Sequence, residues 1–295
     1  MAGDLGVHDP VLVTGIGGVP YTVFSTNTPI QMRQSSDGVH FAPVGSALPS
    51  APNWWSSYTA GANNAWAPDV SFHNGQYWMY YAVSSFGSKN SAIGLATSLT
   101  GAPGTWADQG IVISSGLLSL YNAIDPNLLV DKDGKWWLIF GSFSTGLYMT
   151  PLNPATGKLA TPLPQLTRIA SRPVFPDPIE ASFVYQHGGY YYLFVSFDYC
   201  CRGINSDYNI RVGRSTSPTG PYVDKNGIPL QQGGGTPVLE THDWVVGPGH
   251  SAVTFDPASG KDLLVYHYYD GRQNGTSRLG INCLEWDPDG WPRAV

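Results

Sequence analysis

Charged side chains are scarce in this sequence. Asp, Glu, Lys and Arg make up 12% of its 295 residues, about half the usual share. No run of basic residues occurs, so we do not expect a nucleic-acid partner. No apolar stretch approaches the roughly 20 residues that a membrane-spanning helix needs, and the first residues, MAGDLGVHDP, lack the pattern of a signal peptide. The formal net charge of −6 mainly favours solubility.

Cysteine is also rare. The three cysteines are Cys200, Cys201 and Cys283, and an odd count is not a disulfide framework. Two adjacent cysteines do not have the spacing of a metal site either. We therefore expect ordinary buried thiols at these positions.

Turn-forming and aromatic residues are abundant instead. The 35 glycines and 24 prolines indicate many turns, and nothing in the sequence supports a long amphipathic helix. The 10 tryptophans and 17 tyrosines favour β-strands and also suit flat sugar-binding surfaces. The fold class we expect is all-β, and one large domain is compatible with the length.

A repeat organises the chain. Three acidic residues are each followed nine positions later by a glycine: Asp9 by Gly18, Asp125 by Gly134 and Glu180 by Gly189. An aromatic-rich apolar run follows each glycine, VPYTVF, KWWLIF or YYYLFV. The repeat predicts one structural unit that places a carboxylate at the same point in every copy.

Two looser copies complete the series. Trp66 lies nine residues before Gly75, and His250 lies ten residues before Gly260. The starts at 9, 66, 125, 180 and 250 are 57, 59, 55 and 70 residues apart, a period typical of a solenoid or a propeller. Each unit contains about four short strands, which predicts a five-bladed β-propeller with residues 1–295 as its single domain. Residues 278–292 are expected to form outer strands of the last blade and to meet the N-terminal segment.

Propeller geometry turns this spacing into a candidate site. The first strand of each blade lines the central channel, so the five starting residues should ring one mouth of it. Two aspartates and a glutamate brought together in this way are candidates for acid/base chemistry.

Five motifs carry a resemblance to a known family. In order and at blade spacing, they resemble glycoside hydrolase family 43 over essentially the whole chain: His8-Asp9-Pro10, Trp66-Ala67-Pro68-Asp69, Asn122-Ala123-Ile124-Asp125-Pro126-Asn127, Ile179-Glu180-Ala181 and Gly249-His250-Ser251. The segment SFDYCCRG at 196–203 is similar to the version found in endo-acting α-1,5-L-arabinanases. The resemblance implies inverting endo-hydrolysis of α-1,5-L-arabinofuranosidic bonds in arabinan, without an organic cofactor.

The resemblance also implies a role for each carboxylate. Asp9 corresponds to the general base, Glu180 to the general acid, and Asp125 to a third member that orients the acid and keeps its pKa raised. Inverting hydrolysis places the acid and the base roughly 6.5–9.5 Å apart, with room for a water molecule. A negative charge beside Glu180 disfavours its ionisation, so the acid keeps its proton near neutral pH.

A histidine occupies the fifth starting position. The resemblance implies that His250 binds a metal in the channel, usually calcium, and calcium prefers oxygen ligands, so waters would complete its shell. The alternative is plain hydrogen bonding in the channel. For His8 and His267 we expect structural hydrogen bonding.

Aromatic residues near the mouth are candidates for sugar contacts. Trp66 is expected to form a sugar platform, with core packing as the alternative. Trp54, Trp55 and Tyr58 lie in a polar loop and are expected to form either a wall of the cleft or packing within the loop.

Polar candidates come from matches to family segments. Asn122, Ser142 and Ser144 are expected to hydrogen-bond sugar hydroxyls that lose water on binding. Arg202 is expected to pair with a channel carboxylate or a sugar oxygen, or to form a local salt bridge. Asp69 is expected to be structural, and Asp198 has no assigned role.

Other functions remain open at this stage. An exo-acting arabinofuranosidase or β-xylosidase of the same family would need a closed pocket, whereas an endo enzyme needs an open groove. A non-catalytic carbohydrate-binding propeller would need repeated pockets, but the starting residues differ from blade to blade, which favours one central site. We expect arabinan or arabino-oligosaccharides as the partner, a monomer, and a location outside the cell, the last inferred from the substrate alone.

Overall fold

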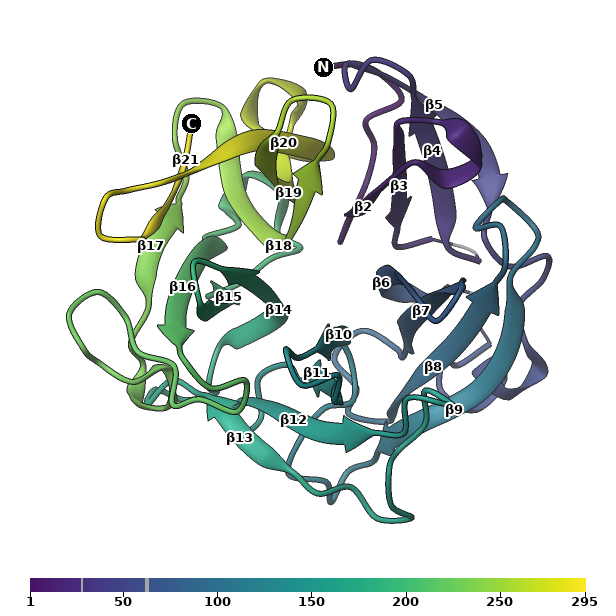
Figure 1. Cartoon of the computed structure of the whole chain (residues 1–295), viewed down its shortest axis with the longest axis horizontal. Coiled ribbons are helices and arrows are strands. Elements are labelled where there is room, and N and C mark those ends of the chain that lie inside the picture. The colour runs from purple at the N-terminus through teal and green to yellow at the C-terminus, as the bar shows by residue number, and fades with distance from the viewer. Residues whose placement is uncertain (28, 62–63) are drawn as a thin grey trace.

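The structure is a computed structural model, and it describes residues 1–27, 29–61 and 64–295. The described residues form five antiparallel sheets arranged around a central channel (Figure 1). The sheets follow one another along the chain, so each is one blade, and we number the blades 1 to 5 in chain order. This arrangement confirms the predicted five-bladed β-propeller.

Each blade runs from an inner strand outward. Blade 1 also has a short parallel strand, β1, at its outer edge. The strands are, in blade 1, β1 Ala2–Gly3, β2 Val11–Thr14, β3 Tyr21–Ser25, β4 Gln31–Ser35 and β5 His40–Ser46; in blade 2, β6 Trp66–His73, β7 Gln76–Val83, β8 Ser91–Ser98 and β9 Ala107–Ser115; in blade 3, β10 Asn127–Val130, β11 Trp136–Phe140, β12 Leu147–Leu152 and β13 Thr167–Ala170; in blade 4, β14 Ile179–His187, β15 Tyr190–Phe197, β16 Asn209–Ser215 and β17 Thr236–Leu239; and in blade 5, β18 Val245–Asp256, β19 Lys261–Asp270, β20 Thr276–Trp286 and β21 Pro292–Ala294.

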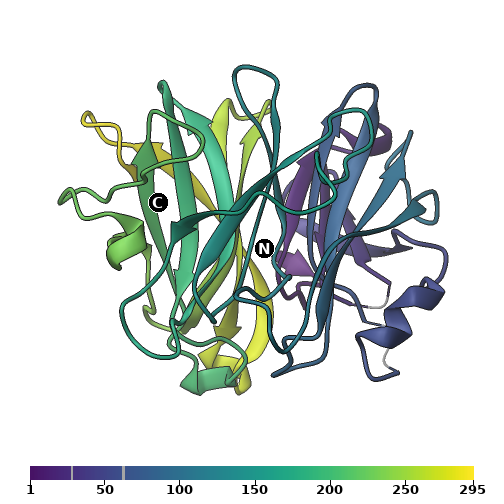
Figure 2. The same ribbon diagram turned by 90° about the horizontal axis from the view of Figure 1, so that it is seen from below.

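In the described part of the chain, helical structure is confined to short 3-10 segments in the loops. These are η1 Ile16–Gly18, η2 Asn53–Ser57, η3 Gly203–Asn205, η4 Leu230–Gln232 and η5 Gly271–Gln273. Seen from the side, the blades stand next to one another with loops at both ends of the channel (Figure 2). Among the described residues, no helix is long and apolar enough to cross a membrane.

The glycines of the repeat have a common structural cause. All five lie between the first and second strands of their blades and have a positive φ, from 69° to 86°: Gly18, Gly75, Gly134, Gly189 and Gly260. This left-handed conformation is strained for residues with a Cβ but costs glycine little, and tight hairpins often require it. The repeated glycine therefore marks the inner hairpin of each blade.

Blade 5 closes the ring against blade 1 without exchanging a strand with it. The Leu279 N–H donates to the Leu5 carbonyl at 2.8 Å, and the Ser277 hydroxyl donates to the Val7 carbonyl. Apolar side chains from both blades share one buried cluster, which includes Leu5, Leu12, Val23, Val265 and Leu279. The prediction that residues 278–292 supply outer strands of the last blade and meet the N-terminal segment is confirmed.

Candidate active site

Every blade has a left-handed residue just before the continuous pairing of its inner strand with the second strand begins. These residues have φ between 47° and 56°, and they are Asp9, Ala67, Asp125, Ala181 and His250. Two residues later, in every blade, the continuous ladder with the second strand begins, at Val11, Asp69, Asn127, Phe183 and Ala252. The five left-handed residues are therefore structurally equivalent.

This register corrects one prediction from the repeat. Asp9, Asp125 and His250 are equivalent as expected, but Glu180 and Trp66 each lie one residue before the equivalent position. The spacing to glycine misleads because the inner hairpins differ in length: Ala181 precedes its glycine by eight residues, Asp125 by nine and His250 by ten. Glu180 thus reaches the mouth from a different backbone position than the two aspartates.

Hydrogen bonds between blades hold these starting residues together. The Ala67 N–H donates to Thr26 Oγ1 (2.9 Å) and the Ala181 N–H donates to Asp125 Oδ2 (3.1 Å). The Asp9 and His250 N–H groups likewise donate to side chains of the preceding blade around the ring, His267 Nδ1 at 3.1 Å and Ser196 Oγ at 2.8 Å. Each bond ties an inner strand to the neighbouring blade, which helps to hold the carboxylates at one mouth.

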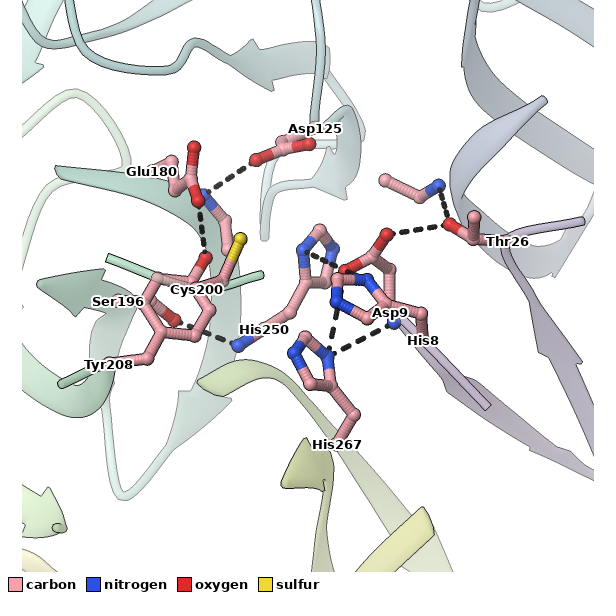
Figure 3. A network of polar contacts seen from close by, with 12 residues as sticks. His8, Asp9, Thr26, Asp125, Glu180, Ser196, Cys200, Tyr208, His250 and His267 are labelled. Carbon is pink, nitrogen blue, oxygen red and sulfur yellow. Dashed lines mark hydrogen bonds and ion pairs between the residues drawn. The ribbon is translucent and has the colours of Figure 1, made fainter. Parts of the chain in front are cut away.

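Asp9 is surrounded by hydrogen-bond donors. Its Oδ1 lies 2.8 Å from His8 Nδ1 and 3.1 Å from His250 Nδ1, and its Oδ2 accepts from Thr26 Oγ1 at 2.6 Å (Figure 3). Burial by itself raises the pKa of Asp9, but His8 and His250 outweigh it and hold that pKa well below its usual range. The carboxylate is therefore ionised, as a general base must be.

The pKa of Glu180 is shifted in the opposite direction from that of Asp9. It is buried, and its carboxyl accepts from Ser142 Oγ at 2.6 Å and from Tyr208 Oη at 2.8 Å. Burial raises the pKa of Glu180, the Ser142 and Tyr208 hydrogen bonds oppose that rise, and the charge of Asp9 adds to it. The net pKa is raised, which suits a group that must hold a proton.

The pKa of Asp125 is also raised, which was not predicted from the sequence. Burial raises the pKa of Asp125, and the charges of Glu180 and Asp9 raise it further, against the opposing effects of His250 and the Ala181 N–H. We predicted an ionised Asp125 beside a protonated Glu180. The pKa values of both carboxyls are raised, so Asp125 also tends to hold a proton.

His250 lies among these carboxylates. Burial lowers its pKa, but Asp9 and Asp125 outweigh burial, and the pKa of His250 is raised to about 9. In the described part of the chain, two groups of side chains place possible metal-ligand atoms within 4.8 Å of one another. They are His8 with Cys200 and Cys201, and His8 with Asp9 and His267. His250 belongs to neither group.

Comparisons with known proteins agree with this site. The family model "Glycosyl hydrolases family 43" matches residues 5–292. The chain belongs to this family. It is 44% identical to an extracellular endo-α-(1→5)-L-arabinanase of Bacillus subtilis, over 97% of this chain and 87% of that protein. A GH43 endo-arabinanase from Bacillus licheniformis has a TM-score of 0.92, with 44% identity and 99% of each chain covered.

Exo-acting relatives are also similar to this family 43 chain. An extracellular exo-α-(1→5)-L-arabinofuranosidase, ArbA, of Cellvibrio japonicus is 38% identical over 99% of this chain and 87% of that protein. One propeller fold therefore serves proteins named for both modes of action.

The predicted sugar-binding residues of this family 43 protein lie in different settings. Trp66 begins β6 and is half-buried. Asn122 is buried and accepts from Ser91 Oγ at 2.7 Å, so its amide oxygen is engaged within the protein. Ser144 is partly exposed beside Ser142, whereas Ser142 donates to Glu180. Arg202 is exposed and stacks on the Tyr199 ring, its guanidinium carbon 3.9 Å from the ring centroid.

Other expectations are now decided. Trp55 is buried in the core cluster of blades 1 and 2, and Trp54 and Tyr58 pack against that cluster, so loop packing is the better interpretation of this aromatic group. Asp69 is structural as predicted, because it accepts from Asn127 Nδ2 and from the Leu128 N–H.

The cysteine prediction was wrong for two of the three residues. Cys200 and Cys201 form a disulfide in the loop between β15 and β16, and Cys201 is exposed. Cys283 is a half-buried free thiol. A cysteine count can indicate a framework of disulfides between distant parts of a chain. It does not reveal a disulfide between adjacent residues.

Two residues at the site lie outside every motif in the sequence. Tyr208 begins no strand and precedes β16, yet its hydroxyl reaches Glu180. Thr26 follows β3 and bridges Asp9 and the Ala67 N–H. No periodic signal marks either residue, because each reaches the site from the end of a different strand.

Proposed function

We propose that this protein is an inverting endo-α-1,5-L-arabinanase. The observation that carries the proposal is the arrangement of three carboxyl groups at one mouth of the propeller: Asp9, whose pKa is held low by His8 and His250, and Asp125 and Glu180, whose pKa values are raised. Inverting glycosidases need this division between a base and an acid. The likeness to proteins named as endo-arabinanases supports the substrate.

In the proposed mechanism, Asp9 removes a proton from a water molecule that attacks the anomeric carbon. Glu180 donates its proton to the departing glycosidic oxygen. Asp125 fixes the backbone next to Glu180 by accepting from the Ala181 N–H. Ser142 and Tyr208 donate to the glutamate that forms, so they stabilise its negative charge.

We propose that Trp66, Asn122, Ser144 and Arg202 contribute to substrate binding. Trp66 would present its ring to a sugar face, Ser144 its hydroxyl, and the exposed Arg202 its guanidinium. Asn122 would act mainly by holding the neighbouring loop, since its amide already bonds Ser91. Ser142 would contribute to binding only through its orientation of Glu180.

We propose that His250 is a ligand of a calcium ion in the channel. Within the described residues, Nδ1 of His250 contacts Asp9 and Nε2 has no protein hydrogen-bond partner, so a water-rich calcium shell fits there. A bound calcium ion would supply the positive charge near the carboxylates that the protonated imidazole supplies without it.

Removing calcium is expected to lower both activity and stability. At a calcium concentration about 100 times its Kd, ligand binding stabilises the folded state by about 2.7 kcal/mol, so a chelator should lower the Tm by roughly 5 °C. Arabinan hydrolysis rates and differential scanning calorimetry measure the two effects, and metal analysis by mass spectrometry after gel filtration shows whether calcium is bound. Magnesium should restore neither. Absence of bound calcium after equilibration, with an unchanged Tm, would refute this site.

Digestion of linear and debranched arabinan is the experiment that tests the function. We expect mixed oligosaccharides at early times, because an endo enzyme cuts at internal bonds, and proton NMR should show the β-anomer forming first. A single short product would favour the exo alternative that the Cellvibrio japonicus relative represents. Binding without hydrolysis would favour a carbohydrate-binding propeller, and cleavage of xylo-oligosaccharides alone would overturn the substrate.

We further propose that the protein acts outside the cell as a monomer. Polymeric arabinan supports the first part, because such a polymer does not enter cells, and relatives are named as extracellular. Light scattering after size-exclusion chromatography tests the second part, and a mass of two chains would contradict it.

A further inference from the structure

The hydroxyl of Tyr269 lies where blades 5 and 1 meet. The side chain of His8 separates it from Asp9. Tyr269 is near the end of β19 and is buried. Its oxygen is 2.7 Å from the Cys201 N–H, 2.9 Å from His8 Nε2 and 3.4 Å from His267 Nε2. A single hydroxyl therefore joins the disulfide loop to two histidines that flank Asp9.

The protonation of His267 follows from its contacts. A backbone N–H can only donate, and the Asp9 N–H donates to His267 Nδ1, so Nδ1 carries no hydrogen. Burial lowers the pKa of His267 well below its usual value, so the ring is neutral and its hydrogen lies on Nε2. That hydrogen faces the Tyr269 hydroxyl.

The Tyr269 oxygen thus receives two hydrogens, one from the Cys201 N–H and one from His267 Nε2. A phenolic oxygen accepts two hydrogen bonds and has one hydrogen to donate. The remaining short contact is to His8 Nε2, so the hydrogen of Tyr269 points there. The Cys201 sulfur, 3.7 Å from the same nitrogen, is only a weak hydrogen-bond partner and does not compete.

These contacts determine the tautomer of His8. Because its Nε2 accepts from Tyr269, a neutral His8 carries its hydrogen on Nδ1, and that atom lies 2.8 Å from Asp9 Oδ1. The ring is further held by stacking on His267, with centroids 3.8 Å apart.

We propose that Tyr269 is a positioning residue that holds His8 as the Nδ1–H tautomer and so directs that hydrogen to Asp9. The consequence for the reaction rests on the proposed function, in which Asp9 is the base. With Oδ1 held by His8 and His250 and Oδ2 by Thr26, rotation of the carboxylate is restrained, and the base would meet the attacking water in one orientation. The loop of Cys200 and Cys201 takes part because its backbone supplies one of the two donors that orient Tyr269.

Proton-detected NMR of the ¹⁵N-labelled protein tests the proposal directly. Two-bond ¹H–¹⁵N spectra distinguish Nδ1–H from Nε2–H in neutral histidine, and His8→Gln identifies the His8 signals. We expect His8 in the wild-type protein to be the Nδ1–H form. In Tyr269→Phe, which removes the hydroxyl but keeps the ring, we expect a mixture of tautomers.

Kinetics supply a second readout. Losing one hydrogen bond that orients the base should lower kcat on arabinan about tenfold, with KM within about twofold of wild type. The matched control is Tyr268→Phe, one residue earlier on β19 and half-exposed, which should change neither the His8 spectrum nor kcat.

Two results would overturn the proposal. One is a wild-type His8 with a hydrogen on Nε2, either as the neutral Nε2–H tautomer or as the doubly protonated ring, which can be seen even if Tyr269→Phe does not fold. The other is an unchanged His8 spectrum in a folded Tyr269→Phe. Failure of the proposed function gives a distinct result. Asp9→Asn would then retain full arabinan hydrolysis, whereas the His8 tautomer would still change in Tyr269→Phe.

Discussion

Replacing Glu180 with glutamine is expected to lower kcat on linear arabinan by about a thousandfold, in the middle of the range for loss of a general acid. Glutamine keeps the shape of the side chain, and its single oxygen can still accept from Ser142 or from Tyr208, which contact different oxygens of Glu180, while its NH2 group can donate to the other hydroxyl. KM should therefore remain close to the wild-type value. The defect should be far smaller on an arabino-oligosaccharide with a dinitrophenyl leaving group, because that group departs without a proton. Initial rates on both substrates measure the difference.

Tyr208→Phe is the matched variant for this acid. It leaves the carboxyl in place but removes a hydrogen bond that lowers the pKa of Glu180. The pKa therefore rises, the proton is kept to higher pH, and the alkaline limb of kcat against pH should move upward by about one pH unit, as expected for one hydrogen bond to a charged group. Full activity of Glu180→Gln would contradict its role as acid, and a downward shift in Tyr208→Phe would contradict the electrostatic explanation.

Replacing Asp9 with asparagine is expected to lower kcat by about a thousandfold or more on both substrates. The water must be activated whatever the leaving group is, so a dinitrophenyl group should not rescue this variant. That contrast separates the base from the acid without any structural measurement. It also follows from the low pKa of Asp9 that the wild-type enzyme should keep its base ionised, and hence its activity, at pH values where an ordinary carboxylate is already being protonated.

Asp198→Asn is the control for a carboxylate near the mouth. Asp198 pairs with Arg172 at 2.6 Å and also accepts from Asn209, and it faces none of the three proposed catalytic groups in the hydrogen bonds of the described residues. We expect near wild-type kcat from Asp198→Asn. Equal losses in Asp198→Asn and Asp9→Asn would show that the assignment of the base is wrong.

The fold could be predicted because its signal is local and repeated. Every inner hairpin needs a left-handed turn residue, and a glycine supplies it in all five blades, for example Gly18, Gly134 and Gly189. The five hairpins therefore appear in the sequence as five regularly spaced glycines. The identities of Asp9, Asp125 and Glu180 followed from the same marks together with the family resemblance.

The register could not be predicted from those marks. A hairpin can gain or lose a residue without losing its glycine, and this places Glu180 and Trp66 one residue before the equivalents of Asp9. Counting from the glycine therefore identifies the blade but not the backbone position of the side chain.

The sequence by itself determined the number of blades, the all-β class and which carboxyl-bearing residues gather at the channel, because all three depend on patterns within about 60 residues of chain. Only the tertiary structure decided how those groups are protonated. Tyr208 at Glu180, Thr26 at Asp9, and Tyr269 behind His8 each act across a boundary between blades or strands. The pKa of a buried carboxyl depends on which charges and donors surround it in space, and neighbours brought together by the folding of a blade or by ring closure leave no periodic trace in the chain.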